Sequence, residues 1–242
     1  MTSLRIAIAG DLHGAWSNHD VAILLAIKPD VVFFVGDLGE ADIRQTKLIK
    51  EVPFPTAVIL GNHDRGNDRT GDFLKKQLNL LDGLHCGWSL MQWPDIPISV
   101  VGARPCSPGG GFFLSQEVKA VFGEISLEES ASKIASSAEK ASFNKPLIIL
   151  AHSGPTGLGS EAWSPCGRDW KKPSMDWGDK DLELAINRIR RRRIPDLVIF
   201  GHMHHQLMKA NKTRKTFVED TFGVKYLNAA CVPRTGVDNK GE

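Results

Sequence analysis

Five short apolar runs spread along the 242-residue chain constrain its fold more than any other feature of the sequence. Each is four or five residues long, and most are rich in valine, isoleucine, leucine or phenylalanine. The runs are Ile6–Ala9, Val31–Val35, Ala57–Leu60, Leu147–Ala151 and Leu197–Phe200. Continuous apolarity without alternation is typical of strands buried on both faces, so we expect the runs to form the interior strands of a sheet protein.

Helical patterns lie between these runs. Ser17 begins the first, with Asp20 three residues later as a capping-box partner, and Pro29 ends it. Four further segments are expected to be helical: 42–51, 72–81, 127–142 and 180–192. Strands that alternate with helices predict an α/β fold.

Each apolar run ends in residue types that bind metal ions. The candidate ligands are Asp11, His13, Asp37, Asn62, His152, His202 and His204. In α/β sheets, ligands bind at the carboxyl ends of strands, so five strand ends would deliver these groups to one edge. Glycine precedes most of them, at Gly10, Gly36, Gly61 and Gly201, and a residue without Cβ lets the chain turn sharply beside an ion. Mixed carboxylate, amide and imidazole donors suit first-row divalent ions.

The motif order DxH, GD, GNHD, H, GHxH resembles that of the calcineurin-like metallophosphoesterases, over residues 9 to about 204. The resemblance implies a four-layer αββα sandwich of the metallo-dependent phosphatase type. It implies a first metal at Asp11, His13 and His204, a second at Asn62, His152 and His202, and a bridge at Asp37. Asn62 and His63 would contact the substrate, and His63 would assist the leaving group with support from Asp64. Residues 166–170 and 229–234 also resemble a subgroup found in cyanobacteria and plant plastids.

Physical chemistry supports these expected roles. Two adjacent cations repel each other, and a shared carboxylate reduces that repulsion. Together they would activate a water for in-line attack on phosphorus, and an imidazole near neutral pH is a natural proton donor for the leaving group. We expect two divalent ions, with manganese favoured over iron, zinc or magnesium.

Composition bounds the remaining questions. The length fits a single domain over residues 1–242, and 42% hydrophobic with 24% charged residues is ordinary for a globular protein. A net charge of +2 gives little support to a nucleic-acid partner, and no apolar run approaches membrane-spanning length. The four cysteines are scattered and predict reduced thiols, so we expect a cytoplasmic enzyme.

Substrate choice is assigned to a long segment, 153–178, that directly follows His152. It carries Trp163, Trp170 and Trp177, and Arg168 is the expected phosphate-binding residue. The combination favours a small phosphorylated substrate with a flat ring, such as a nucleotide. The competing interpretation is that the tryptophans only pin the loop to the body of the protein.

Two other functions are weighed against the phosphoesterase. A non-catalytic interaction module on the same scaffold is disfavoured because no ligand is missing. A nuclease is disfavoured by the low net charge, and the arginine-rich segment 188–193 is interpreted as the solvated end of a helix. The second block reads GDLGE and the third GNHD, which also disfavours the protein-phosphatase branch. Towards the C-terminus, 215–218 and 224–228 are expected strands, whereas the polar residues 235–242 are not.

Overall fold

Two β-sheets form the centre of the protein in a computed structural model that describes residues 3–208 and 211–230. The first sheet is parallel, in the order β1-β2-β3, and the second has the order β4-β5-β6-β7-β9-β8. The strands of the first are β1 (Ile6–Ala9), β2 (Val31–Phe34) and β3 (Thr56–Val58). Those of the second are β4 (Leu90–Met91), β5 (Ser99–Gly102), β6 (Leu147–Leu150), β7 (Leu197–Phe200), β8 (Phe217–Glu219) and β9 (Lys225–Asn228). Only the outer strands β4 and β8 of the second sheet pair antiparallel.

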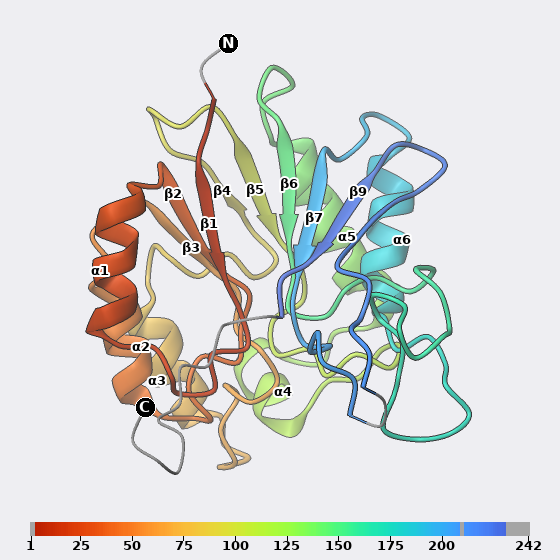
Figure 1. Cartoon of the computed structure of the whole chain (residues 1–242), viewed down its shortest axis with the longest axis horizontal. Helices are drawn as coiled ribbons and strands as arrows, with labels where there is room; N and C mark the ends of the chain where they lie inside the picture. The colour runs from red at the N-terminus through yellow and green to blue at the C-terminus, as the bar shows by residue number, and fades with distance from the viewer. Residues whose placement is uncertain (1–2, 209–210, 231–242) are drawn as a thin grey trace.

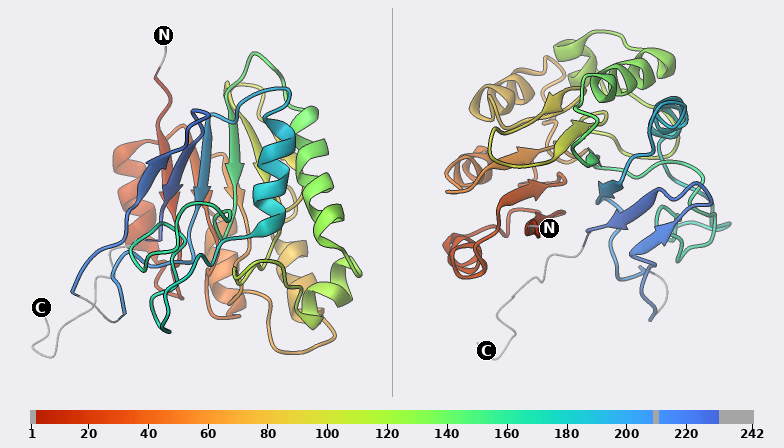
Figure 2. Two further views of the ribbon diagram at one scale, coloured as in Figure 1. Left: turned by 90° about the vertical axis from the view of Figure 1, so that its right-hand side faces the viewer. Right: turned by 90° about the horizontal axis from the view of Figure 1, so that it is seen from above.

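Helices cover the outer faces of the sheets, as Figures 1 and 2 show. Four helices accompany the first sheet: α1 (Asn18–Ile27), α2 (Ile43–Lys50), α3 (Asp72–Leu80) and α4 (Gln116–Phe122). Two helices pack on each other beside the second: α5 (Leu127–Glu139) and α6 (Lys180–Ile189). The layers follow in the order helices, sheet, sheet, helices, which is the four-layer sandwich expected from the motif order.

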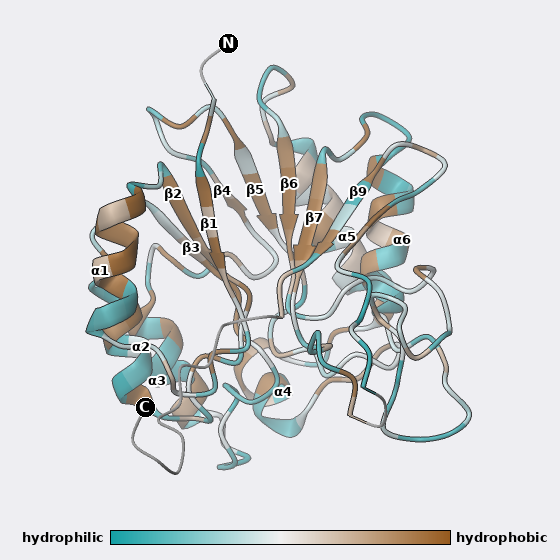
Figure 3. Cartoon of the chain, viewed as in Figure 1, coloured by the Kyte–Doolittle hydropathy of each residue, from teal (hydrophilic) through white to brown (hydrophobic). Residues whose placement is uncertain are grey.

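The apolar runs are continuous because each strand contributes to two cores. In β2, Val32 and Phe34 pack towards the helices, whereas Val31 and Phe33 pack in the cluster between the sheets. In β6, the even-numbered residues face the first sheet and the odd-numbered ones face α5 and α6. Alternate side chains point to opposite faces of a strand, so a strand between two cores must be apolar at every position. Strands β2, β6 and β7 are accordingly brown along most of their length in Figure 3.

The first helix begins and ends as its sequence predicts. The Ser17 hydroxyl and the Asp20 carboxylate form a capping box, and the chain leaves the helix at Lys28, directly before Pro29. Two other predicted helices are three residues too long, because the structure ends α5 at Glu139 and α6 at Ile189. Helix α4 and strands β4 and β5 were not predicted. The expectation for residues 235–242 lies outside the described part of the chain.

The parallel pairing brings the carboxyl ends of the strands into line. Ala9 pairs with Phe34, and Phe34 pairs with Val58, while in the second sheet Leu150 pairs with Ile199. The loops that carry the candidate ligands therefore start at one edge of the sandwich. No helix in the described part of the chain is long and apolar enough to span a bilayer.

Candidate metal centre

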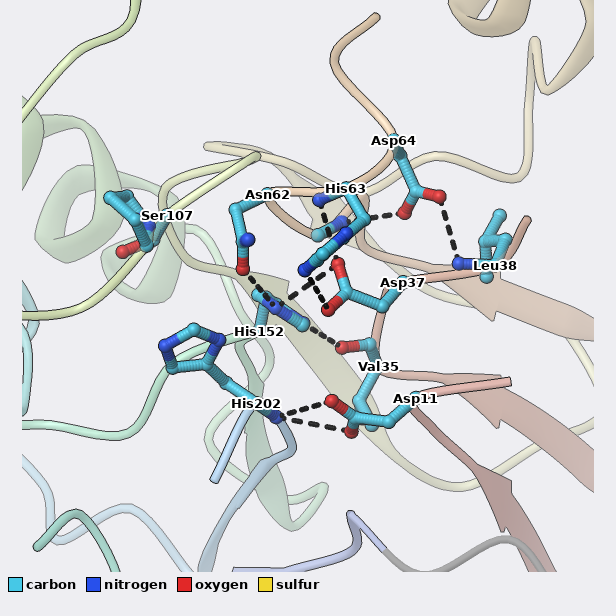
Figure 4. A network of polar contacts seen from close by, with 12 residues as sticks. Asp11, Val35, Asp37, Leu38, Asn62, His63, Asp64, Ser107, His152 and His202 are labelled. Carbon is cyan, nitrogen blue, oxygen red and sulfur yellow. Dashed lines mark hydrogen bonds and ion pairs between the residues drawn. The ribbon is translucent and has the colours of Figure 1, made fainter. Parts of the chain in front are cut away.

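The predicted ligands converge at this edge, as Figure 4 shows for several of them. They fall into two groups whose donor atoms lie within 4.8 Å of one another. The first group is Asp11, His13 and His204, and the second is Asp37, His152 and His202, with Asn62 beside it. These are the sets that the resemblance assigns to two metals.

The glycines before the ligands are required for close approach. A Cβ on Gly61 would lie 2.2 Å from Oδ1 of Asp37, and one on Gly201 would lie 2.4 Å from Oδ2 of Asp11. Gly36 has φ +93°, and a Cβ there would lie 2.6 Å from Nδ1 of His152. Any side chain at these positions would collide with a carboxylate or imidazole of the centre.

Four of the seven ligands have a left-handed backbone although they are not glycine. Their φ angles are 54° for Asp11, 46° for His13, 52° for Asp37 and 68° for His202. Such conformations cost about 1–3 kcal/mol each and tend to occur at functional sites, where the surrounding structure enforces them. The strain aims the donor atoms inward instead of along the regular path of the chain.

The first group presents three donors to a common point. Nε2 of His13 lies 3.2 Å from Nε2 of His204, which in turn lies 3.5 Å from Oδ1 of Asp11. The backbone N–H of His202 donates to both oxygens of Asp11 at 3.0 Å and so fixes the carboxylate. Imidazole nitrogens and a carboxylate oxygen that meet in this way form a donor set for a divalent cation.

The second group is deeper. Nδ1 of His152 donates to the carbonyl of Val35 at 2.7 Å, which leaves Nε2 facing Asn62 Oδ1 at 3.0 Å and Asp37 Oδ1 at 3.4 Å. A metal-binding histidine commonly donates its other ring N–H to a backbone carbonyl in this way. Nε2 of His202 is buried without a hydrogen-bond partner among the described residues. Since buried polar atoms are normally bonded, this nitrogen fits a metal ligand.

Asp37 faces both groups. Its Oδ1 lies 3.4 Å from His152, and its Oδ2 lies 3.9 Å from Nε2 of His13 in the other group. The backbone N–H of His63 donates to Oδ1 at 2.9 Å. The two oxygens of one carboxylate therefore point towards different donor sets, which is the arrangement that a bridging ligand requires.

The pKa values of the buried groups favour a cation between them. Burial raises the pKa of Asp37, but His152 and His202 outweigh burial and hold that pKa well below its usual range. Burial lowers the pKa of His152, yet the Asp37 carboxylate raises it to about 10. Burial and the charge on His152 lower the pKa of His202 to about 4, so its ring is neutral and free to bind a cation. A metal bound at this site would displace the proton of His152, because a ligating imidazole must be deprotonated.

The catalytic candidate His63 is half exposed at the rim of the centre, with Nε2 4.0 Å from Oδ2 of Asp37. Its Nδ1 contacts Oε2 of Glu40 at 2.7 Å, and the other oxygen of Glu40 contacts Nδ1 of His13. The sequence interpretation missed Glu40. Its signal was a carboxylate three residues after Asp37, in the same short segment GDLGE. One carboxylate thus contacts both a candidate metal ligand and the candidate proton donor.

Asp64 does not orient the ring of His63 in this structure. It is buried, and its oxygens accept the backbone N–H groups of Leu38 and Gly61, each at 2.8 Å. These contacts hold the loop of Asp37 against the loop of Asn62. Burial and the neighbouring charge of Asp37 raise the pKa of Asp64 to about 7, although the two amide contacts oppose the shift. Asp64 therefore connects the two loops that carry Asp37 and Asn62. The contact with the ring of His63 that was expected from Asp64 is made by Glu40 instead.

Arg168 is buried in the long loop. Its guanidinium lies 5.2 Å from the ring of Trp177 and donates to the carbonyl of Pro173 at 2.8 Å. The indole N–H of Trp177 donates to the carbonyl of Pro108 at 3.0 Å, so this tryptophan holds the loop against residues 107–112, which include three consecutive glycines. The expected phosphate contact of Arg168 stays a prediction, since the structure places its guanidinium against protein atoms.

Comparison with known proteins agrees with the site. The family described as calcineurin-like phosphoesterase matches residues 4–206. The solved structures that resemble the chain include three that align over most of its length. A protein from Thermus thermophilus is 14% identical, with 94% of this chain and 91% of that one aligned and a TM-score of 0.54. A phosphopantetheinyl hydrolase from Mycobacterium tuberculosis is 15% identical over 93% and 88%, with a TM-score of 0.56. A dimetal phosphatase from Danio rerio is 12% identical over 93% and 86%, with a TM-score of 0.55.

At these identities the solved structures establish the fold alone. No curated protein matches the sequence, and the resemblance to a cyanobacterial and plant-plastid subgroup stays a prediction. The family match spans most of the chain and includes all seven candidate ligands. The chain belongs to the calcineurin-like phosphoesterases, and it is a metal-dependent hydrolase of phosphoric esters.

Proposed function

We propose that this protein hydrolyses a small phosphoester with two divalent cations bound side by side. The observation that carries the proposal is the position of Asp37, whose two oxygens face two separate groups of metal donors. Asp11, His13 and His204 would hold one cation, and Asn62, His152 and His202 the other. The mixed oxygen and imidazole set favours manganese, with iron, zinc and magnesium as alternatives.

When bound, two such cations supply Lewis acidity to a phosphoryl oxygen and to the attacking water. The protein supplies position and proton transfer. The backbone N–H of His63 fixes Oδ1 of Asp37, while Glu40 holds Nδ1 of the same histidine. Because Nδ1 is occupied, Nε2 is the nitrogen that remains for a proton to the leaving oxygen. The side chain of His63 is 45% exposed, which leaves it accessible to a substrate.

The substrate is proposed to be a small phosphorylated molecule, such as a nucleotide, cleaved as a monoester or a diester. The resemblance to a fold neighbour named phosphopantetheinyl hydrolase supports a small organic phosphate. The arginine-rich segment 188–193 does not support a nuclease, because two of its arginines are engaged by other parts of the protein. Arg188 pairs with Glu128, and Arg193 donates to the carbonyls of Ser142 and Lys145.

A cytoplasmic location is part of the proposal. The three cysteines in the described part of the chain, Cys86, Cys106 and Cys166, are buried free thiols. Burial raises the pKa of each of these thiols, so they remain protonated and unreactive. Unpaired thiols are typical of proteins from reducing compartments.

The test is metal analysis combined with a substrate screen. Purified protein, stripped of metal and reconstituted with Mn²⁺, should bind close to two equivalents per chain. It should then hydrolyse at least one class among phosphomonoesters, phosphodiesters, nucleotides and phosphopeptides. Full activity with a single equivalent would refute the dinuclear mechanism. Two bound equivalents without turnover of any class would favour the non-catalytic module instead.

A further inference from the structure

A surface pocket of about 570 Å³ lies beside the long loop, between that loop and the chain that follows β7. The two segments lie beyond the carboxyl ends of β6 and β7, on the side of the metal centre (Figure 1). Its apolar lining comes from Ala162, Pro173 and Leu207. Pockets of a few hundred cubic ångströms with apolar walls are the usual size for small organic ligands.

The same pocket is lined by three cations whose charge is not neutralised by the protein. Arg168 is 9% exposed, and Lys171 and Lys172 are exposed at the rim. Within the described residues, none of the three forms an ion pair, and Nε of Arg168 is buried without any hydrogen-bond partner. Buried charges are normally paired, so an uncompensated arginine points to an anion supplied from outside.

The one acidic residue of the lining is already engaged. Oδ2 of Asp169 accepts the backbone N–H of Met208 at 2.7 Å, and Oδ1 lies 3.6 Å from the guanidinium of Arg214. Asp169 therefore belongs to the scaffold between the two segments and does not cancel the charge of the pocket.

Arg214 ties this pocket to the metal centre. Its buried guanidinium donates to the carbonyl of the metal ligand His204 at 3.0 Å. It also donates to the carbonyls of Ala162 at 2.8 Å and Gly167 at 2.6 Å, directly before Arg168. Leu207, on the opposite wall, is three residues after His204. The hydrogen bonds of Arg214 thus join His204 to the loop wall of the pocket, and the chain itself joins His204 to Leu207.

We infer that this pocket binds a second anionic group of the substrate, while the scissile phosphoryl group lies at the metal centre. The inference rests on the proposed function and specifies its substrate class: an organic molecule that carries two phosphoryl groups on an apolar or aromatic body. The cations hold the distal phosphoryl group, and Ala162, Pro173 and Leu207 contact the body. Arg168 stacks on Trp177 and donates to Pro173, so its role is a fixed charge, whereas the lysines reach the ligand.

Kinetics on matched substrates test this inference. The double variant Lys171→Ala/Lys172→Ala removes two charges from the pocket, and Lys133→Ala/Lys140→Ala removes two exposed charges from α5 and its end as the control. Substrates are compared in pairs that differ by one phosphoryl group, such as adenosine 3′,5′-bisphosphate and adenosine 5′-monophosphate. Wild type should prefer the bisphosphate in at least one pair. The pocket variant should lose about tenfold or more of that preference in kcat/KM, since charge-assisted contacts to phosphate are strong.

The control variant should keep the preference and should hydrolyse an aryl monophosphate at the wild-type rate. Equal preference in the pocket variant and wild type, or no preference for a bisphosphate in any pair, would overturn the inference. A binding experiment separates it from the proposed function. The Asp37→Ala protein should bind the bisphosphate by calorimetry more tightly than inorganic phosphate, and the two lysine substitutions should abolish the difference. If no phosphoester is turned over at all, the proposed function fails, yet this binding result still decides whether the pocket recognises a bisphosphate.

Discussion

The glycine before Asn62 offers the sharpest test of how the centre is built. Gly61 has an ordinary backbone conformation, so alanine there introduces no strain in φ. Its only effect is the added methyl group, which would lie 2.2 Å from Oδ1 of Asp37 and 2.4 Å from the backbone N of the same residue. The backbone atom cannot rotate away, and the loop of Asp37 must therefore shift.

Overpacking of this kind typically costs about 1–3 kcal/mol. Here the displaced group is the proposed bridge, so the cost falls on metal binding as well as on folding. We expect Gly61→Ala to weaken Mn²⁺ affinity by about 5–150-fold, the same energy expressed as a binding constant. Calorimetric titration of the metal-free protein with Mn²⁺ measures this change directly. Thermal melts with and without Mn²⁺ should show that the stabilisation by metal is reduced.

Gly154→Ala is the matched control. Its methyl group would lie 2.6 Å from Sγ of Cys166 and 2.7 Å from the ring of Phe200, so its nearest neighbours are core side chains and include no carboxylate. That variant should melt at a lower temperature but retain the metal-induced stabilisation. Two equivalents of Mn²⁺ bound by Gly61→Ala with wild-type affinity would show that the loops are not fixed as the structure describes.

Three other predictions concern single side chains. Asp37→Ala should lose metal and activity together. His63→Ala should keep both metals and lose about 10²–10⁴-fold in rate, with the smallest loss on substrates that have acidic leaving groups. Full activity of His63→Ala on poor leaving groups would exclude the assigned role of His63. Glu40→Ala should lower turnover or metal affinity by about 10–100-fold, and wild-type kinetics at saturating Mn²⁺ would show that Glu40 is dispensable. His85 has a buried Nε2 without a partner among the described residues, and burial lowers its pKa from 6.5 to about 4. As the pH falls, His85 is protonated in the unfolded chain before it is protonated in the folded protein. The free energy of unfolding should therefore decrease as the pH drops from about 6.5 to about 4, by about 3 kcal/mol at most. Urea unfolding of His85→Phe across that pH range should show a smaller loss, and equal losses in both proteins would count against the assignment.

Local sequence signals predicted the elements that carry the centre. The strands β1, β2, β3, β6 and β7 were recognised because a strand buried on both faces must be apolar throughout. By contrast, Ser99 interrupts the apolar character of β5, and its strand depends on pairing with β4 and β6. Helix α4 has only seven residues, and so short a helix is stable only through its packing.

The seven candidate ligands were identified from the sequence alone, because each lies within four residues after the end of a parallel strand, and parallel strands end at a common edge. The sequence also identified the glycines beside them, where the structure leaves no room for a Cβ at Gly36, Gly61 or Gly201. Only the tertiary structure decided which carboxylate contacts the ring of His63. Asp64 is adjacent to His63 in the chain, yet it turns inward to the amides of Leu38 and Gly61. Glu40 reaches the ring because its own left-handed backbone, with φ 49°, directs it across the loop. The side chains of adjacent residues can point in different directions. Here their directions are set by the packing of two loops that lie more than twenty residues apart in the sequence.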